Sequence, residues 1–302
     1  MSAVISIRGL TKRYGSKTVV DRLDLEVPQG SIYAFLGDNG AGKTSTIKVL
    51  VGMHPPDSGS AEILGENCWS KAISLRHRVG YVPERPRFYE WMTVSEIGWF
   101  TSTFHRNGFL GKFHEAVADL GLDPTKRLRD LSKGGYARVA LALALAPEPE
   151  VLILDEPTSG LDLLTRRDFL ASLVDRASEG RTVFISSHGI SELERVASHV
   201  GLLSHGKLIM SGPVEEVKRQ FARLLFRVQG EPPDLANLGL VLHKQILGKQ
   251  MEVLIQSPVA GMADRVRNQS GVSELEESVP SLEDIYAAVM RYVGQTPKEV
   301  PR

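Results

Sequence analysis

The pattern of apolar and polar residues predicts strands and helices along most of the chain. Short aliphatic runs bounded by glycine, proline or polar clusters predict strands at residues 4–7, 24–27, 32–36, 61–65, 78–83, 151–156 and 182–187. Apolar residues at helical spacing predict helices at residues 46–50, 97–104, 113–120 and 138–146. The polar residues 12–16 predict a turn after the first strand. Together these elements indicate an α/β fold.

Two changes of pattern divide the chain into regions. Residues 85–146 are mostly helical in character, and Thr93 followed by Glu96 predicts a capped helix start there. A hairpin is expected at residues 201–209. Beyond residue 213 the pattern predicts a helix at 214–221, strands at 224–228, 241–245 and 251–255, and then a helix, a strand and a helix. We therefore predict a first domain at residues 1–213 with a helical insertion at 85–146, a small α+β domain at 214–302, and a frayed tail from residue 295.

Residues 37–44 fit the pattern G-x-x-x-x-G-K-S/T between a predicted strand and a predicted helix, which indicates a P-loop. Its glycines let backbone N–H groups turn inward around a phosphate that also lies at the positive end of a helix. Lys43 supplies a cation for the outer phosphates, and Thr44 supplies a hydroxyl ligand for Mg²⁺. The alternative, a glycine-rich turn with a chance lysine, does not explain the complete match in this context. The predicted phosphate-binding residues are Gly37, Asn39, Gly40, Ala41, Gly42, Lys43, Thr44 and Ser45.

Polar residues elsewhere are further candidates for chemistry. The run at residues 151–156 ends in Asp155 and Glu156, as expected for a strand that is buried on both faces and delivers acids at its carboxyl edge. His188 follows the next aliphatic run, and the glycine-bearing turn at residues 131–135 opens a helix that can hold a second phosphate. Each has a structural alternative, since buried carboxylates can be structural and a lone histidine usually is. Tyr14 could stack on a flat base or simply pack.

Composition narrows the class of protein. The 302 residues contain 36 Lys and Arg and 36 Asp and Glu, so no net field favours nucleic acid or an anionic membrane surface. Cys68 is the single cysteine, which excludes an internal disulfide and fits a reducing cytosol. We see no secretory signal, and no apolar run approaches the roughly 18 to 20 residues needed to cross a bilayer. The expected location is cytoplasmic.

In order and spacing, these motifs resemble the nucleotide-binding subunits of ABC transporters from about Tyr14 to Ser211. The resemblance implies a P-loop NTPase core that binds ATP and Mg²⁺, with Tyr14 stacking on adenine. Asp155 would help to hold Mg²⁺, Glu156 would polarise the attacking water, and His188 would be the switch histidine. Residues 131–135 resemble the family's LSGGQ element, whose Ser132 and Gly134 would contact ATP held by a second copy. Residues 159–162 resemble its D-loop, which contains Asp162.

The sequence departs from the family pattern at several positions. Glu84 replaces the family's glutamine after a strand, where it could still contact ATP, orient water or approach Mg²⁺, but adds negative charge beside phosphates. Lys133 and Gly135 replace Gly and Gln in the LSGGQ element, and Asp38 stands where the family often has proline. From about residue 214 the chain is similar, more weakly, to an extra domain on the ATPase subunits of bacterial exporters.

The resemblance implies the ATPase of a bacterial exporter. Two copies would bind MgATP between them at the cytoplasmic face of the membrane and drive separately encoded integral membrane permease subunits, with no nucleic acid involved. A soluble relative acting in DNA maintenance or translation is the alternative, but the chain lacks the long coiled coil, zinc cysteines or second cassette usual there. A P-loop kinase would leave Ser132, Gly134 and His188 unexplained.

Overall fold

The chain forms two compact units in the computed structural model, which describes residues 3–105 and 108–295. The first unit is Met1–Ser211 and the second is Gly212–Arg302. Most of the tail for which the sequence predicts fraying, residues 296–302, lies outside the described residues.

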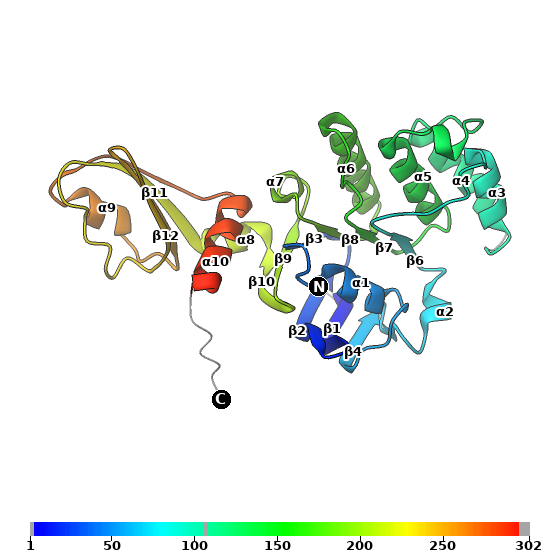
Figure 1. The fold of residues 1–302 in the computed structure, drawn as a ribbon, viewed down its shortest axis with the longest axis horizontal. Coiled ribbons are helices and arrows are strands. Elements are labelled where there is room, and N and C mark those ends of the chain that lie inside the picture. The colour runs from blue at the N-terminus through cyan, green and yellow to red at the C-terminus, as the bar shows by residue number, and fades with distance from the viewer. Residues whose placement is uncertain (1–2, 106–107, 296–302) are drawn as a thin grey trace. The chain divides into compact units, whose positions relative to one another are not determined.

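A six-stranded sheet with the order β10-β9-β3-β8-β7-β6 forms the centre of the first unit. Its strands are β3 (Ile32–Gly37), β6 (Val79–Val82), β7 (Val151–Asp155), β8 (Thr182–Ser187), β9 (His199–Ser204) and β10 (Lys207–Pro213). From β9 through β6, neighbouring strands are parallel. Every residue of β3, β7 and β8 is buried, because helices and the second sheet cover both faces. The α/β fold class is confirmed (Figure 1).

The second sheet of this unit is antiparallel, with the order β2-β1-β4-β5. It consists of β1 (Ala3–Tyr14), β2 (Lys17–Pro28), β4 (Ser58–Ile63) and β5 (Glu66–Asn67). The turn predicted at residues 12–16 is present but shorter, because the strand continues through Tyr14 and only Gly15 and Ser16 turn. Backbone pairing of Lys12 with Val20, and of Tyr14 with Lys17, overrides the polar composition.

The helices of the first unit follow the strands or form a separate cluster. They are α1 (Lys43–Leu50), α2 (Ala72–Leu75), α3 (Val94–Ser102), α4 (Phe109–Asp119), the 3-10 turn η1 (Leu128–Asp130), α5 (Lys133–Leu145), α6 (Leu163–Ser178) and α7 (Ile190–Leu193). Helices α3, α4 and α5 gather on the side of β6 and β7 away from β1 and β4 (Figure 1). The predicted capping box of Thr93 and Glu96 is confirmed. Our helix at 138–146 starts too late, because Ser132 caps α5.

Helix α6 is not predicted from the sequence. This helix buries only Phe169, Leu170 and Leu173 among its 16 residues, so its apolar stripe is narrow and its remaining positions are mostly polar.

Up to residue 295, where the described part of the chain ends, the second unit consists of a four-stranded antiparallel sheet with three helices. Its elements are α8 (Val214–Arg219), β11 (Phe221–Val228), β12 (Leu240–Leu247), β13 (Gln250–Gln256), α9 (Met262–Arg267), β14 (Val272–Ser278) and α10 (Leu282–Gln295), with the strand order β12-β13-β11-β14. Its own hydrophobic core includes Leu224, Phe226, Val253, Ile255 and Val266. The predicted helix at 214–221 is shorter in the structure, because Phe221 begins β11.

Candidate nucleotide-binding and hydrolysis site

The P-loop connects the carboxyl end of β3 to the first turn of α1. Gly42 is the residue before the helix and has φ +112°, while Gly40 has φ +81°, both in the region that favours glycine. A Cβ atom on Gly42 would lie 2.7 Å from the carbonyl oxygen of Val19, so glycine is required by space as well as by backbone angle. Helix α1 thus starts with free backbone N–H groups beside a loop without bulky side chains, which suits an anion.

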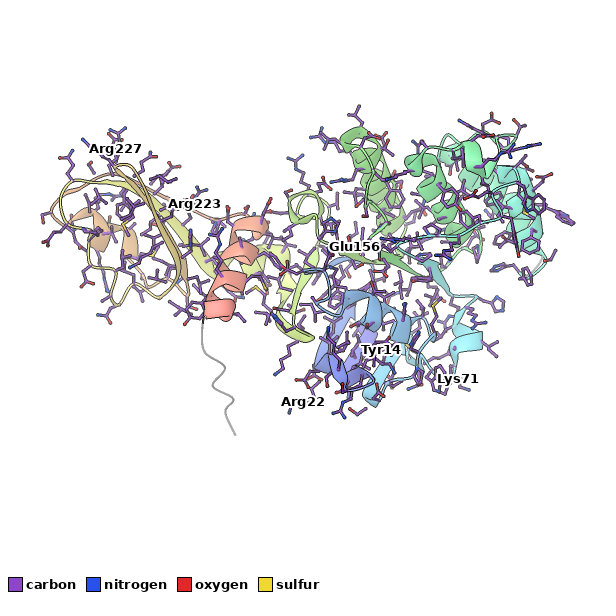
Figure 2. All side chains as sticks on the ribbon, in the orientation of Figure 1. Tyr14, Arg22, Lys71, Glu156, Arg223 and Arg227 are labelled. Carbon is purple, nitrogen blue, oxygen red and sulfur yellow. The ribbon has the colours of Figure 1, made fainter. Side chains whose placement is uncertain are left out.

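The P-loop forms one wall of a cavity of about 550 Å³. Because β3, β8 and β7 are parallel neighbours, their carboxyl ends and the side chains beyond them meet at this edge of the sheet. Figure 2 shows Glu156 in this region, just beyond β7. The cavity is lined by Val19, Asp38, Asn39, Gly40, Gly42, Lys43, Thr44, Ser45, Glu84, Arg85, Glu156, Ser159 and His188. Of the predicted site residues, the cavity lining lacks Tyr14, Gly37, Ala41, Asp155, Ser132, Gly134 and Asp162, although Ser159 of the predicted D-loop does line it.

Lys43, Glu156 and His188 form one connected polar chain. Nζ of Lys43 donates to the carbonyl oxygen of Gly37 at 2.6 Å and lies 3.1 Å from Oε1 of Glu156. The second carboxylate oxygen of Glu156 lies 2.7 Å from Nδ1 of His188 and accepts the backbone N–H of His188 at 3.3 Å. The Lys43 and Glu156 side chains are only 6% and 9% exposed, whereas that of His188 is 57% exposed. A buried cation and a buried acid therefore face each other beside the P-loop.

Asp155 lies under Thr44 at the base of the site. Its Oδ1 accepts hydrogen bonds from the hydroxyl of Thr44 at 3.2 Å and from the hydroxyl of Ser186 at 2.7 Å. Burial raises the pKa of Asp155, with smaller contributions from the charges of Glu156 and Glu84, while the two hydrogen bonds lower it. A divalent cation near Thr44 would relieve this cost, because it favours the charged carboxylate. The pair therefore fits Mg²⁺.

Within the described residues no group of three or more His, Cys, Asp and Glu could hold a metal ion by itself. A Mg²⁺ ion at Thr44 would depend on phosphate oxygens and water for its other ligands, which is the usual arrangement for this ion.

The backbone of Glu156 is strained. Its φ is +48°, which is uncommon for a residue other than glycine. Its N–H donates both to the carbonyl oxygen of Ser186 at 3.2 Å and to the hydroxyl of Ser186 at 3.0 Å. Ser186 therefore fixes the two neighbouring acids, Asp155 and Glu156. Ser186 is not predicted as a site residue from the sequence, although two serines at the end of an apolar run, just before His188, were a usable signal.

Glu84 follows β6 and lies at the boundary between two cavities. It lines the P-loop cavity and a second one of about 560 Å³, which also includes Ser132, Lys133, Ser159 and Gly160. Its side chain is 41% exposed, with an ion contact to Arg85 at 3.5 Å. The acid is thus placed between the phosphate cradle and the start of α5.

Ser132, Gly134 and Asp162 have local structural roles within their own chain. The hydroxyl of Ser132 caps α5 by accepting the N–H of Gly135 at 3.1 Å. Asp162 caps α6 through the N–H and hydroxyl of Thr165, and the hydroxyl is the main reason that the pKa of Asp162 is lowered. A Cβ atom on Gly134 would lie 2.4 Å from Cγ2 of Thr165, so the absence of a side chain lets α5 and α6 approach closely.

Tyr14 ends β1, in the part of the molecule formed by the antiparallel sheet (Figure 2). It is 41% exposed. The paired strand β2 carries Val19, which lines the P-loop cavity. The hairpin therefore connects Tyr14 to the cavity wall.

Taken together, the P-loop, its lysine, and two acids at the ends of parallel strands define a P-loop ATPase. A family described as "ABC transporter" matches residues 20–159, and a family described as "AAA domain, putative AbiEii toxin, Type IV TA system" matches residues 128–194. The chain belongs to the ABC transporter family, in which it is an ATP-binding and ATP-hydrolysing subunit.

Relatives and a solved structure agree with this assignment. The chain is 39% identical over 229 residues to the bacitracin transport ATP-binding protein BcrA of Bacillus licheniformis, covering 74% of each chain. It is 32% identical over 295 residues to the Nod factor export ATP-binding protein I of Burkholderia lata, covering 94% of this chain and 96% of the relative. It superimposes with TM-score 0.66 and 25% identity on cbiO1 from Clostridium perfringens, part of the ABC transporter complex cbiONQ. The superposition covers 73% of this chain and 92% of cbiO1.

Proposed function

We propose that this chain is the ATPase of an exporter, in which two copies bind MgATP between them at the cytoplasmic face of a membrane. Separately encoded integral membrane subunits would form the transport path. Within the described ranges no helix is both long and apolar enough to span a membrane. The names of BcrA and of the Nod factor export protein support a role in transport or export. The observation that carries the ATPase role is the polar chain of Lys43, Glu156 and His188 beside the P-loop, in which Lys43 and Glu156 are buried.

The site residues divide the work of phosphoryl transfer. Backbone N–H groups of the P-loop hold the phosphates, and Lys43 offsets their charge. Thr44 and Asp155 would hold Mg²⁺, which neutralises charge on the phosphates when it is bound. Glu156 orients a water and accepts its proton, and His188 holds the Glu156 carboxylate in place through the 2.7 Å contact. Glu84 stands at the side of the same cavity, where it contacts the nucleotide or its metal.

Each complete site would need two copies of the chain. Ser132 and Gly134 of one copy would cover the ATP held by Lys43 of the other, with Asp162 close to the shared surface. A mixture of a Lys43→Ala chain and a Ser132→Arg chain tests this arrangement, because each variant alone is expected to be inactive. With free exchange, about half of the dimers are mixed and each has one intact site, so about a quarter of the wild-type activity should return. An active monomer would contradict the proposal.

Exposed aromatic side chains support docking to a membrane partner. Tyr89, Trp91, Trp99 and Phe104, on α3 and next to it, are each more than half exposed. The Phe100 ring links two of them, at 5.6 Å from the ring of Tyr89 and 5.5 Å from that of Phe104, and the Trp91 ring lies 6.1 Å from that of Tyr89. An aromatic surface of this kind indicates a protein interface. We infer that the membrane subunits bind here, next to Glu84.

Purification in detergent from the native host tests the partner directly. Wild-type chain should bring an integral membrane protein with it, and a chain with Trp91→Ser and Trp99→Ser should not. The matched control is Trp69→Ser, since Trp69 is also exposed, at 49%, but lies outside the α3 region. ATP hydrolysis by the isolated variant should stay unchanged. Recovery of ribosomes or DNA, and of no membrane protein, would refute the transport role.

The second unit has its own core and contributes none of the residues that line the P-loop cavity. We propose that residues 214–302 form an accessory domain without a part in the chemistry.

A further inference from the structure

Four charged residues are buried among the described residues, namely Lys12, Lys43, Asp155 and Glu156. Charged side chains are rarely buried unless they are paired or used. Three of the four belong to the hydrolysis site. Lys12, at 7% exposure, lies on β1 and has no role in that site.

The Lys12 ammonium is held by fixed partners. Its Nζ donates to the carbonyl oxygen of Pro55 at 2.8 Å and lies 3.1 Å from Oδ2 of Asp57. Asp57 also accepts the backbone N–H of Arg13 at 2.7 Å. That hydrogen bond and the one from Lys12 keep the pKa of Asp57 below its usual value. The segment at residues 54–57 therefore anchors Lys12 against the end of β1.

The same ammonium lies 5.5 Å from the ring centroid of Tyr14, within the range of a cation–π contact. A second group meets the ring edge-on, since the His54 ring is 5.8 Å away at an interplanar angle of 68°. Nδ1 of His54 lies 3.4 Å from the Tyr14 hydroxyl, and the backbone N–H of His54 donates to Lys48 of α1. The Tyr14 ring is thus attached to the helix that starts at the P-loop, while 41% of the residue stays exposed.

We propose that Lys12 and His54 are positioning residues that hold the Tyr14 ring in place to stack on the nucleobase of ATP. The inference rests on the proposed ATP-binding function and on the expectation from the sequence that Tyr14 stacks on adenine. A ring that is already fixed loses little side-chain freedom when the base binds. A cation beside the ring also draws π-electron density toward itself, which makes the open face a better partner for an electron-rich purine.

Comparing ATP with inorganic tripolyphosphate tests the proposal in the full-length chain, because tripolyphosphate has phosphates but no base. Lys12→Met should weaken ATP binding about threefold to tenfold and leave tripolyphosphate binding within about twofold. Lys12→Arg should retain most of the ATP affinity. Tyr14→Ala should lose about tenfold or more for ATP alone, the loss expected from base stacking. The matched control is Lys207→Met, an exposed lysine paired with Asp21 at 3.4 Å, which should change neither affinity.

The outcomes separate the inference from the role on which it rests. An equal loss for both ligands in Lys12→Met, or no loss for either, overturns the inference. If Tyr14→Ala leaves the ratio of the two affinities unchanged, the stacking role of Tyr14 itself is wrong. If Lys12→Met does not fold, as judged by its thermal unfolding, His54→Ala decides the matter, since it leaves the Lys12–Asp57 pair intact. An unchanged ratio of affinities in that variant then also refutes the inference.

Discussion

Replacing Glu156 by glutamine is expected to slow ATP hydrolysis severely while tightening ATP binding. The carboxylate lies 3.1 Å from Nζ of Lys43, and both side chains are less than one tenth exposed. An ATP γ-phosphate that binds Lys43 has to compete with this carboxylate and is also repelled by it. Glutamine has nearly the same shape but no charge, so the competition ends while the packing is kept.

The two effects have different magnitudes. Losing a positioned general base costs about 10²- to 10⁴-fold in rate. Hydrogen bonds to charged groups contribute about 1.5–3 kcal/mol. If competition from the Glu156 carboxylate weakens ATP binding by about 1.4 kcal/mol, its removal raises the affinity for ATP about tenfold. We therefore expect kcat to fall at least about 100-fold and the Kd for ATP to fall about tenfold.

Phosphate release and calorimetry measure these quantities separately, and size-exclusion chromatography with ATP should show a trapped dimer of the Glu156→Gln chain. The matched control is Glu150→Gln, an exposed acid that pairs with Arg78 at 2.6 Å far from the P-loop in sequence, which should change neither quantity. Hydrolysis near the wild-type rate would show that another group is the base. An unchanged or weaker ATP affinity would refute the competition between Glu156 and phosphate for Lys43.

Three further predictions concern neighbouring positions. Gly134→Ala should destabilise the chain by about 1–3 kcal/mol in denaturant unfolding, because its Cβ would lie 2.4 Å from Cγ2 of Thr165. Adding Thr165→Ser removes that methyl group and should restore stability. If ATP hydrolysis by the double variant nevertheless stays low, this result supports a contact between Gly134 and the ATP held by a second copy. Asp155→Asn should stabilise the chain at neutral pH but abolish Mg²⁺-dependent hydrolysis. Because burial raises the folded pKa of Asp155, its carboxylate costs stability as pH rises through that pKa, so the gain should vanish below the unfolded pKa. Glu84→Gln should keep the basal ATPase rate of the isolated chain and change its stimulation by the membrane partner, whereas complete loss of basal activity would make the carboxylate itself essential.

The sequence by itself was sufficient to predict features that depend on residues close to one another along the chain. The P-loop is such a feature, because glycines, a lysine and a hydroxyl at fixed spacing between a strand and a helix describe one local structure. The aliphatic run before Asp155 and Glu156 likewise predicts a doubly buried strand, and Thr93 with Glu96 predicts a capped helix. These signals depend on backbone propensity and on pairs a few residues apart, so they could be found without the fold.

Only the tertiary structure decided features that depend on contacts between distant segments. Composition favoured a turn at Lys12 and Tyr14, but pairing with β2 keeps them in a strand, and a partner more than forty residues later, Asp57, allows Lys12 to be buried. Helix α6 has only a narrow apolar stripe, and the helix is stable because this stripe packs against the sheet. The pairing of Lys43 with Glu156 follows from parallel strands that bring their carboxyl ends to one edge. Burial removes the competing water, and this makes such long-range contacts strong enough to override local preference.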